Sequence, residues 1–119
     1  MALTLRSDNK IRNNYEFKRA YAKGKSHVGP SIITYALKNR LGYVRYGITT
    51  SKKIGNAVKR NRARRVIKAA YMALEPQIKG SYDLVFVGRA RTTCVKSTVV
   101  QAAMLKQLRE IGIVDGKNC

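Results

Sequence analysis

A dense run of Lys and Arg between residues 51 and 65 constrains this chain more than any other feature of its sequence. The run reads S-K-K-I-G-N-A-V-K-R-N-R-A-R-R and contains no acidic residue that could neutralise it. Gly55 and Asn56 are typical of a turn followed by a helix N-cap, because Gly tolerates any backbone dihedral and an Asn oxygen accepts from an early helical N–H. We therefore expect a helix from about Ala57 until Pro76 ends it, and a fold that exposes its charge.

Helical spacing divides this predicted helix into two arcs. One arc is apolar and holds Val58, Ala63, Val66, Ala69, Ala70, Ala73 and Leu74. The opposite arc is basic and holds Arg60, Asn61, Arg64, Arg65 and Lys68, together with Tyr71. Lys59 and Arg62 fall among the apolar positions, which predicts that the first two turns extend beyond the surface on which the helix packs.

The charge of this helix favours a polyanion partner over a merely solvated surface. Cations at a helix N-terminus interact unfavourably with the helix dipole. A charge of the favourable sign at this position stabilises a helix by about 0.3–1 kcal/mol. Surface helices normally mix both signs and gain from pairs at i,i+4. Such a local inconsistency is typical of a functional site.

The residues around the basic run are similar to the signature of a known family. Arg45-x-Gly47 precedes the segment Ser51-Lys52-Lys53-Ile54-Gly55-Asn56-Ala57-Val58-x-Arg60-Asn61-Arg62-x-Arg64-Arg65. This string resembles the signature of the bacterial ribonuclease P protein component, and the resemblance extends from about Asn14 through Arg89. It implies contacts with the catalytic RNA subunit through a basic set of residues: Lys52, Lys53, Asn56, Lys59, Arg60, Asn61, Arg62, Arg64, Arg65 and Lys68.

The same resemblance implies a second site, for the single-stranded 5′ leader of precursor tRNA. In the family a cleft between the first helix and the sheet holds the leader, and its aromatic positions fall on Phe17, Tyr21 and Tyr35 here, with Arg89 beside them. Unpaired bases stack on aromatic faces for about 1–3 kcal/mol each. From spacing alone, Phe17 and Tyr21 with Ala20 between them are more typical of core packing. The resemblance favours the binding interpretation.

Composition agrees with a nucleic-acid partner and disfavours a membrane. The 119 residues carry 25 Lys and Arg against 6 Asp and Glu, a formal net charge of +19. This charge attracts any polyanion and says nothing about the fold. No apolar run approaches the roughly 18 residues of a spanning helix, and residues 1–14 lack the apolar segment of a signal peptide, so we expect a cytoplasmic chain.

The sequence also predicts one α+β domain over residues 1–119, with a flexible basic arm at 1–13 and a tail at 113–119. Asn13 and Glu16 indicate a capping box for a first helix that ends at Gly24. Segments 31–38 and 44–50 are expected to form an antiparallel hairpin, with a weaker strand at 26–28. The apolar run in 81–89 predicts a strand buried on both faces, and a last helix spans 95–111 up to Gly112.

The predicted order is helix, three strands, basic helix, strand and helix, a two-layer arrangement in which a mixed four-stranded sheet packs with helices. Physics favours a right-handed crossover through the basic helix. The resemblance implies instead the rare left-handed βαβ crossover of a ribosomal-protein-like fold.

No catalytic or metal site can be assembled from the sequence. The acids Asp8, Glu16, Glu75, Asp83, Glu110 and Asp115 are scattered singly, so no pair indicates general acid–base work or a two-metal site. Cys94, Cys119 and His27 have no metal-binding spacing. An autonomous nuclease is disfavoured, and a ribosomal or generic RNA-binding protein without a role in cleavage is the main alternative.

The resemblance implies an accessory role in this chemistry. The RNA subunit would hold the catalytic Mg²⁺, and the protein would bind no cofactor and no small-molecule substrate of its own. It would assist endonucleolytic removal of the 5′ leader. Three departures from the family pattern are Thr49 and Thr50 before Ser51, and Gly88 before Arg89.

Overall fold

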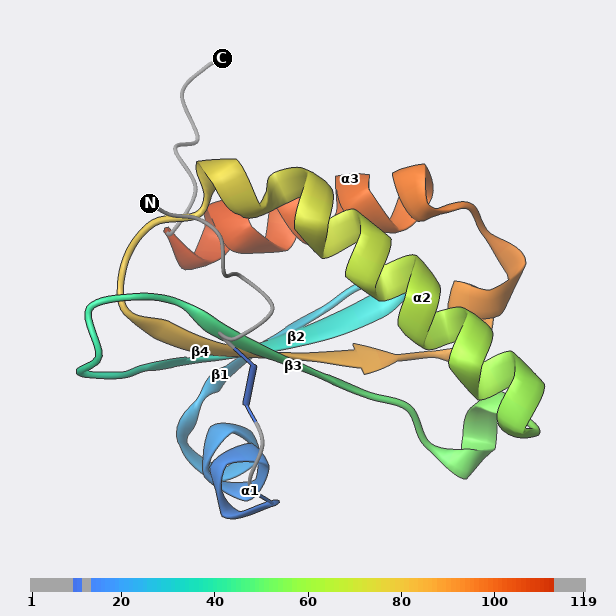
Figure 1. Cartoon of the computed structure of the whole chain (residues 1–119), viewed down its shortest axis with the longest axis horizontal. Coiled ribbons are helices and arrows are strands. Elements are labelled where there is room, and N and C mark those ends of the chain that lie inside the picture. The colour runs from blue at the N-terminus through green and yellow to red at the C-terminus, as the bar shows by residue number, and fades with distance from the viewer. Residues whose placement is uncertain (1–9, 12–13, 113–119) are drawn as a thin grey trace.

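The computed structural model describes residues 10–11 and 14–112, and Figure 1 shows the arrangement of their helices and strands. The predicted tail and Asn13 of the predicted capping box lie outside the described residues. Within the predicted arm, residues 10 and 11 are described and the others are not. The elements, with η for short 3₁₀ helices, are α1 (Asn14–Lys23), β1 (Lys25–Val28), β2 (Ile32–Lys38), β3 (Arg45–Thr49), η2 (Lys52–Ile54), α2 (Ala57–Leu74), η3 (Glu75–Gln77), β4 (Tyr82–Gly88), η4 (Ala90–Cys94) and α3 (Ser97–Ile111).

The four strands form one mixed sheet in the order β1-β2-β4-β3. β4 pairs antiparallel with β2 and parallel with β3. The predicted hairpin between β2 and β3 is therefore wrong, because β4 lies between these two strands. The reason is the apolar run Leu84–Val87, in which Leu84, Val85 and Phe86 are fully buried and require a central strand with both faces covered.

Helices cover the two faces of the sheet unequally. α2 and α3 lie side by side across one face, whereas α1 packs on the other, as Figure 1 shows. The chain passes from β3 through α2 to its parallel neighbour β4 in a left-handed crossover. The α+β class, the element order and this crossover are confirmed.

The main core lies between the sheet and the pair α2 and α3. Tyr71 of α2 is fully buried, and its ring stacks on Tyr46 of β3 with centroids 4.4 Å apart and packs at 5.5 Å from Phe86 of β4. The prediction that Tyr71 lies on the exposed basic arc of α2 is therefore wrong. The prediction that Val58 lies on the buried apolar arc is also wrong, because Val58 is 74% exposed. The buried stripe of α2 is Ala63, Ile67, Ala70, Tyr71 and Leu74.

A smaller core lies between the sheet and α1. It holds Ile11, Ala20 and Val85, against which Phe17, Tyr35 and Val87 pack. Gly24 follows α1 as predicted, but its backbone φ is not in the left-handed region. A Cβ at Gly24 would lie 2.5 Å from the carbonyl oxygen of Ala20 and 2.8 Å from that of Ala36. Gly24 is thus required because the chain passes close to β2.

The last helix begins slightly later than the apolar pattern predicts. Residues Ala90–Cys94 form η4, and α3 starts at Ser97. Gly112 ends α3 as predicted, with φ of 97° and its N–H bonded to the carbonyl of Leu108.

Candidate nucleic-acid interface

The start of α2 is fixed by two short polar caps. The hydroxyl of Ser51 accepts from the backbone N–H of Lys53, and this bond caps the start of η2. Gly55 then adopts φ of 139°, a conformation that favours glycine, and the side chain of Asn56 accepts from the N–H of Lys59 at 3.0 Å. The predicted turn and N-cap are confirmed. They bring the Lys and Arg of η2 next to the first turns of α2.

Three arginines of α2 reach three different segments of the chain. Arg60 donates to the carbonyl of Gly55 at 3.4 Å, and Arg62 donates to the carbonyl of Thr93 in η4 at 3.0 Å. Arg64 donates to the hydroxyl of Thr50 at 3.3 Å. Each guanidinium has five N–H donors, so each is oriented by one bond and keeps donors for a ligand.

The other predicted RNA-contact residues on η2 and α2 are solvent-exposed. They are Lys52, Lys53, Asn56, Lys59, Asn61, Arg65 and Lys68. Lys59 and Arg62 lie on the first two turns, next to η2 and η4 rather than over the main core. The start of α2 lies beside η2 and η4 at one end of the sheet (Figure 1).

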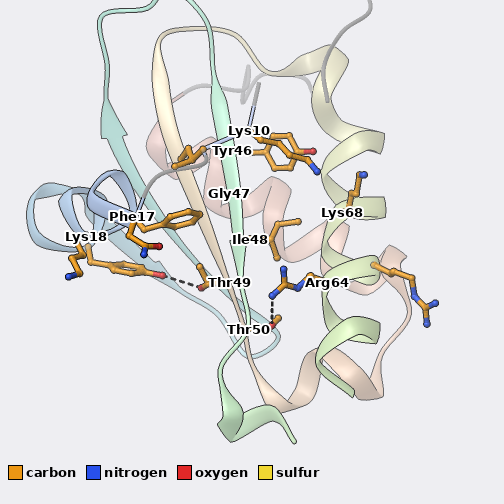
Figure 2. A pocket seen from close by; sticks show the side chains of 14 residues that line it. Lys10, Phe17, Lys18, Tyr46, Gly47, Ile48, Thr49, Thr50, Arg64 and Lys68 are labelled. Carbon is orange, nitrogen blue, oxygen red and sulfur yellow. Dashed lines mark hydrogen bonds between the residues drawn. The ribbon is translucent and has the colours of Figure 1, made fainter. Parts of the chain in front are cut away.

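A cleft of about 730 Å³ separates α1 from α2, with β3 as its floor. One wall holds Phe17, Lys18 and Tyr21 of α1, and the opposite wall holds Arg64, Arg65 and Lys68 of α2. In Figure 2, Phe17 reaches toward β3 from one side and Arg64 reaches it from the other. The remaining lining residues are Lys10, Ile11, Asn14, Tyr46, Gly47, Ile48, Thr49 and Thr50. The cleft thus combines aromatic faces with a row of cations.

Gly47 creates the room for the aromatic wall. A Cβ at this position would lie 2.6 Å from Cε1 and 2.7 Å from Cζ of Phe17. The ring of Phe17 therefore lies directly against the backbone of β3, which only a glycine permits. This contact explains the Gly of the Arg45-x-Gly47 motif.

Two of the residues predicted to bind the leader lie outside the cleft lining. Tyr35 of β2 packs edge-on against Tyr21, with ring centroids 4.9 Å apart and an interplanar angle of 77°. It is placed to support the ring of Tyr21 from behind. Arg89, at the end of β4, donates to the carbonyl of Gly29 at 2.8 Å. The structure thus brings Phe17 and Tyr21 together in the cleft, with Tyr35 next to them and Arg89 apart.

A buried ionic network positions the wall formed by α1. Arg45 of β3 donates to both carboxylate oxygens of Asp83 at 2.9 and 2.8 Å, and to Glu16 of α1 at 2.8 Å. Asn39 donates to Asp83 at 2.8 Å, and Arg19 lies 3.7 Å from the same carboxylate. The network joins α1 to β3 and β4, and it accounts for the Arg of the Arg45-x-Gly47 motif.

This network shifts the ionisation of its members. Burial alone would raise the pKa of Asp83, but hydrogen bonds from Arg45 and Asn39 and the charges of Arg45 and Arg19 bring it below its ordinary value. The hydrogen bond to Asp83 raises the pKa of Arg45 against the effect of burial, with further help from Glu16. Asp83 and Arg45 are therefore charged at neutral pH.

Sequence reasoning missed this network. It treated Glu16 as a capping residue and the acids as isolated, whereas Glu16 and Asp83 bind one guanidinium. A signal was available: Asp83 is the acid at the head of an otherwise apolar buried strand, and a buried carboxylate requires a cationic partner.

Metal and membrane features are limited in the part of the chain that the structure describes. Among residues 10–11 and 14–112, no three or more His, Cys, Asp or Glu side chains gather as a metal site would require. No helix within those ranges combines the length and apolar character needed to cross a membrane.

Comparison with known proteins gives consistent results. The family model described as Ribonuclease P matches residues 5–112. A ribonuclease P protein component of Alkaliphilus metalliredigens is 38% identical over 112 residues, covering 92% of this chain and 99% of the relative. One from Clostridium botulinum (strain Loch Maree) is 38% identical, covering 89% and 96%. A structure of Staphylococcus aureus RNase P protein at 2.0 Å superposes with a TM-score of 0.78 at 27% identity, covering 90% of this chain and 98% of that protein.

Proposed function

The chain belongs to the ribonuclease P protein family, and from this premise we propose that it binds the catalytic RNA of ribonuclease P and the 5′ leader of precursor tRNA. Membership makes it a subunit of an endoribonuclease complex that processes tRNA. The proposal assigns the two RNA partners to two surfaces of the protein. The leader enters the cleft, and the catalytic RNA contacts the exposed basic residues of η2 and α2.

The observation that best supports leader binding is the contrast between the two walls of the cleft. Phe17 and Tyr21 offer aromatic faces on one side, and Arg64, Arg65 and Lys68 offer positive charge on the other. A single strand has bases on one side of its sugars and phosphates on the other, so both walls can be used at once. A duplex hides its base faces and could use only the basic wall.

Binding of the catalytic RNA is assigned to the cations outside the cleft, whereas Arg64, Arg65 and Lys68, for which the resemblance implied the same partner, line the cleft and are assigned to the leader. Lys52, Lys53, Lys59, Arg60 and Arg62 lie around the turn between η2 and α2, where Gly55 and Asn56 hold the backbone. Arg60 and Arg62 are already oriented by bonds to Gly55 and Thr93, so less side-chain entropy is lost when they meet phosphates.

The protein acts by positioning and charge neutralisation in this scheme. One cationic scaffold brings the leader and the catalytic RNA together and reduces repulsion between their phosphates. The Mg²⁺ ions that drive hydrolysis are assigned to the RNA, since Glu16 and Asp83, two carboxylates that share one guanidinium, are both bound by Arg45. The expected result is tighter substrate binding and a lower Mg²⁺ requirement.

The direct test is cleavage of a precursor tRNA at low Mg²⁺ by a bacterial ribonuclease P RNA, with the protein, without it, and with the protein alone. We expect the protein alone to be inactive and its addition to restore cleavage by the RNA. RNA binding without restored cleavage would favour a generic RNA-binding protein. Cleavage by the protein alone would refute the assignment of catalysis to RNA.

A further inference from the structure

Three hydroxyl groups lie between the aromatic and the basic wall of the cleft. The hydroxyl of Tyr21 lies 3.1 Å from Oγ1 of Thr49, and one of these two groups donates to the other. Oγ1 of Thr50 accepts from Nη2 of Arg64 at 3.3 Å. Figure 2 shows both bonds, one from Thr49 toward α1 and one from Thr50 toward α2. We call Tyr21, Thr49 and Thr50 the hydroxyl strip.

The hydroxyl strip keeps both donors and acceptors for a ligand. Each hydroxyl has one O–H donor and two acceptor lone pairs. The bond between Tyr21 and Thr49 uses a single O–H, so the pair retains one donor and several lone pairs. Thr50 accepts from Arg64 and retains its own O–H. All three residues line the cleft, and Thr49 and Thr50 are only partly buried.

The position of the strip matches the sugar of a bound nucleotide. Bases stacked on Phe17 and Tyr21 would lie against α1, and phosphates paired with Arg64 and Arg65 would lie against α2. The sugar joins base to phosphate, so it must lie between the walls, over Thr49 and Thr50. In RNA that sugar carries a 2′-hydroxyl, which is both a donor and an acceptor and is the group that distinguishes RNA from DNA.

We propose that the hydroxyl strip binds a 2′-hydroxyl of the leader and makes the cleft selective for ribose over deoxyribose. Stacking and phosphate pairing do not distinguish the two sugars, because both use groups that RNA and DNA share. The strip adds that distinction at the centre of the cleft. This inference rests on the proposed function, since it requires a single-stranded leader in the cleft.

The test compares three substrates bound to the holoenzyme assembled from the full chain and a bacterial ribonuclease P RNA. They share one tRNA body and carry a ribose leader, a 2′-deoxyribose leader of the same sequence, or no leader. Dissociation constants are measured by stopped-flow fluorescence before cleavage. One hydrogen bond is worth a factor of about three to ten, so the deoxyribose leader should bind the wild type that much more weakly.

Variants assign the preference to the strip. The double variant Tyr21→Phe with Thr49→Val keeps the ring and the side-chain shape but removes two hydroxyls, and it should bind the ribose and deoxyribose leaders equally. Thr49→Ser keeps the hydroxyl and should keep the preference. Tyr43→Phe removes a phenolic hydroxyl from an exposed side chain in the loop between β2 and β3, outside the cleft lining, and should also keep it.

The outcomes separate this inference from the proposed function. If neither leader improves binding over tRNA without a leader, leader binding itself fails. If both leaders improve binding equally in the wild type, or if the double variant still prefers ribose, the hydroxyl strip has no such role.

Discussion

The two faces of the sheet use different chemistry to hold their helices. On the face covered by α2 and α3, the rings of Tyr46, Tyr71 and Phe86 pack in a continuous apolar core. On the face covered by α1, the apolar cluster is small, and the helix is also held by Glu16 and Arg45.

This difference separates stability from binding. Burial of large apolar side chains is the main favourable term in folding, and it is concentrated on the α2 and α3 face. β3 is the edge strand of the sheet, and the cleft runs along it between α1 and exposed residues of α2. An ionic network can fix the position of α1 without filling the cleft with side chains. Changes in the buried main core should therefore affect folding, and changes among the residues that line the cleft should affect RNA binding.

The largest effect is expected from Phe86→Ala on the main-core face. Phe86 is fully buried, and removal of its ring should lower the free energy of unfolding by about 3–5 kcal/mol through lost burial and a residual cavity. Urea denaturation followed by circular dichroism measures this. Protein that remains folded should still prefer leader-bearing tRNA. The separation of the two faces would be wrong if that preference disappeared in the folded fraction.

Arg45→Met tests the network on the α1 face. The change leaves Asp83 buried and without its main partner, which should cost about 3 kcal/mol of unfolding free energy. It should also loosen α1, so leader binding falls together with stability. Arg40→Met, at an exposed position in the loop between β2 and β3, is the matched control and should change neither quantity. An Arg45 variant with wild-type leader binding would show that α1 is positioned without the network.

The pKa of Asp83 predicts how this network responds to acid. Its folded-state pKa lies below the ordinary value of about 3.9, so the unfolded chain binds the proton more readily. The stabilisation is complete above about pH 4 and is lost as the pH falls further. The difference in unfolding free energy between wild type and Asp83→Asn should therefore be constant above about pH 5 and should narrow as the pH falls below about 4. Urea denaturation at successive pH values measures this difference. A constant difference would show that ionisation of Asp83 contributes nothing.

Local patterns in the sequence correctly predicted those parts of the fold that neighbouring residues determine. The N-cap at Asn56, the buried run in β4 and the glycine at Gly112 are each determined by neighbours within a few residues. The basic residues of the site were found for the same reason. Their density along 51–65 requires no knowledge of the fold.

The parts that failed depend on contacts between distant segments. β2 and β3 follow each other in sequence, yet each pairs with β4, because the apolar run of β4 occupies the central place in the sheet. Tyr71 is buried because Tyr46 and Phe86 face it from two strands. The leader cleft needed the resemblance, because the spacing of Phe17 and Tyr21 alone favoured core packing. Gly47 explains why Phe17 lies in the cleft.

Phe17→Ala should have a smaller and more selective effect than the changes in either core. Loss of one stacking face should weaken binding of leader-bearing substrate to the holoenzyme by about 1–3 kcal/mol, with little change for mature tRNA. Gly47→Ala offers a second route to the same result, because the added Cβ would displace the ring while Phe17 remains. Tyr15→Ala, on the same helix but 64% exposed and outside the cleft lining, is the control. Equal losses from Tyr15→Ala would contradict a specific site.

Arg62→Ala should have the smallest effect and should appear in a different assay. Arg62 lies at the turn of α2 next to η4, outside the cleft lining, with one N–H bonded to Thr93. Loss of its phosphate contact should weaken assembly with the catalytic RNA by about 1 kcal/mol and reduce the slope of log affinity against log salt by about one. Arg109→Ala, on the exposed end of α3, removes the same charge elsewhere and should have less effect. If Arg62→Ala lowered the preference for leader-bearing substrate as much as it lowered assembly, the two RNA surfaces would not be separate, and the division of labour between α1 and the start of α2 would fail.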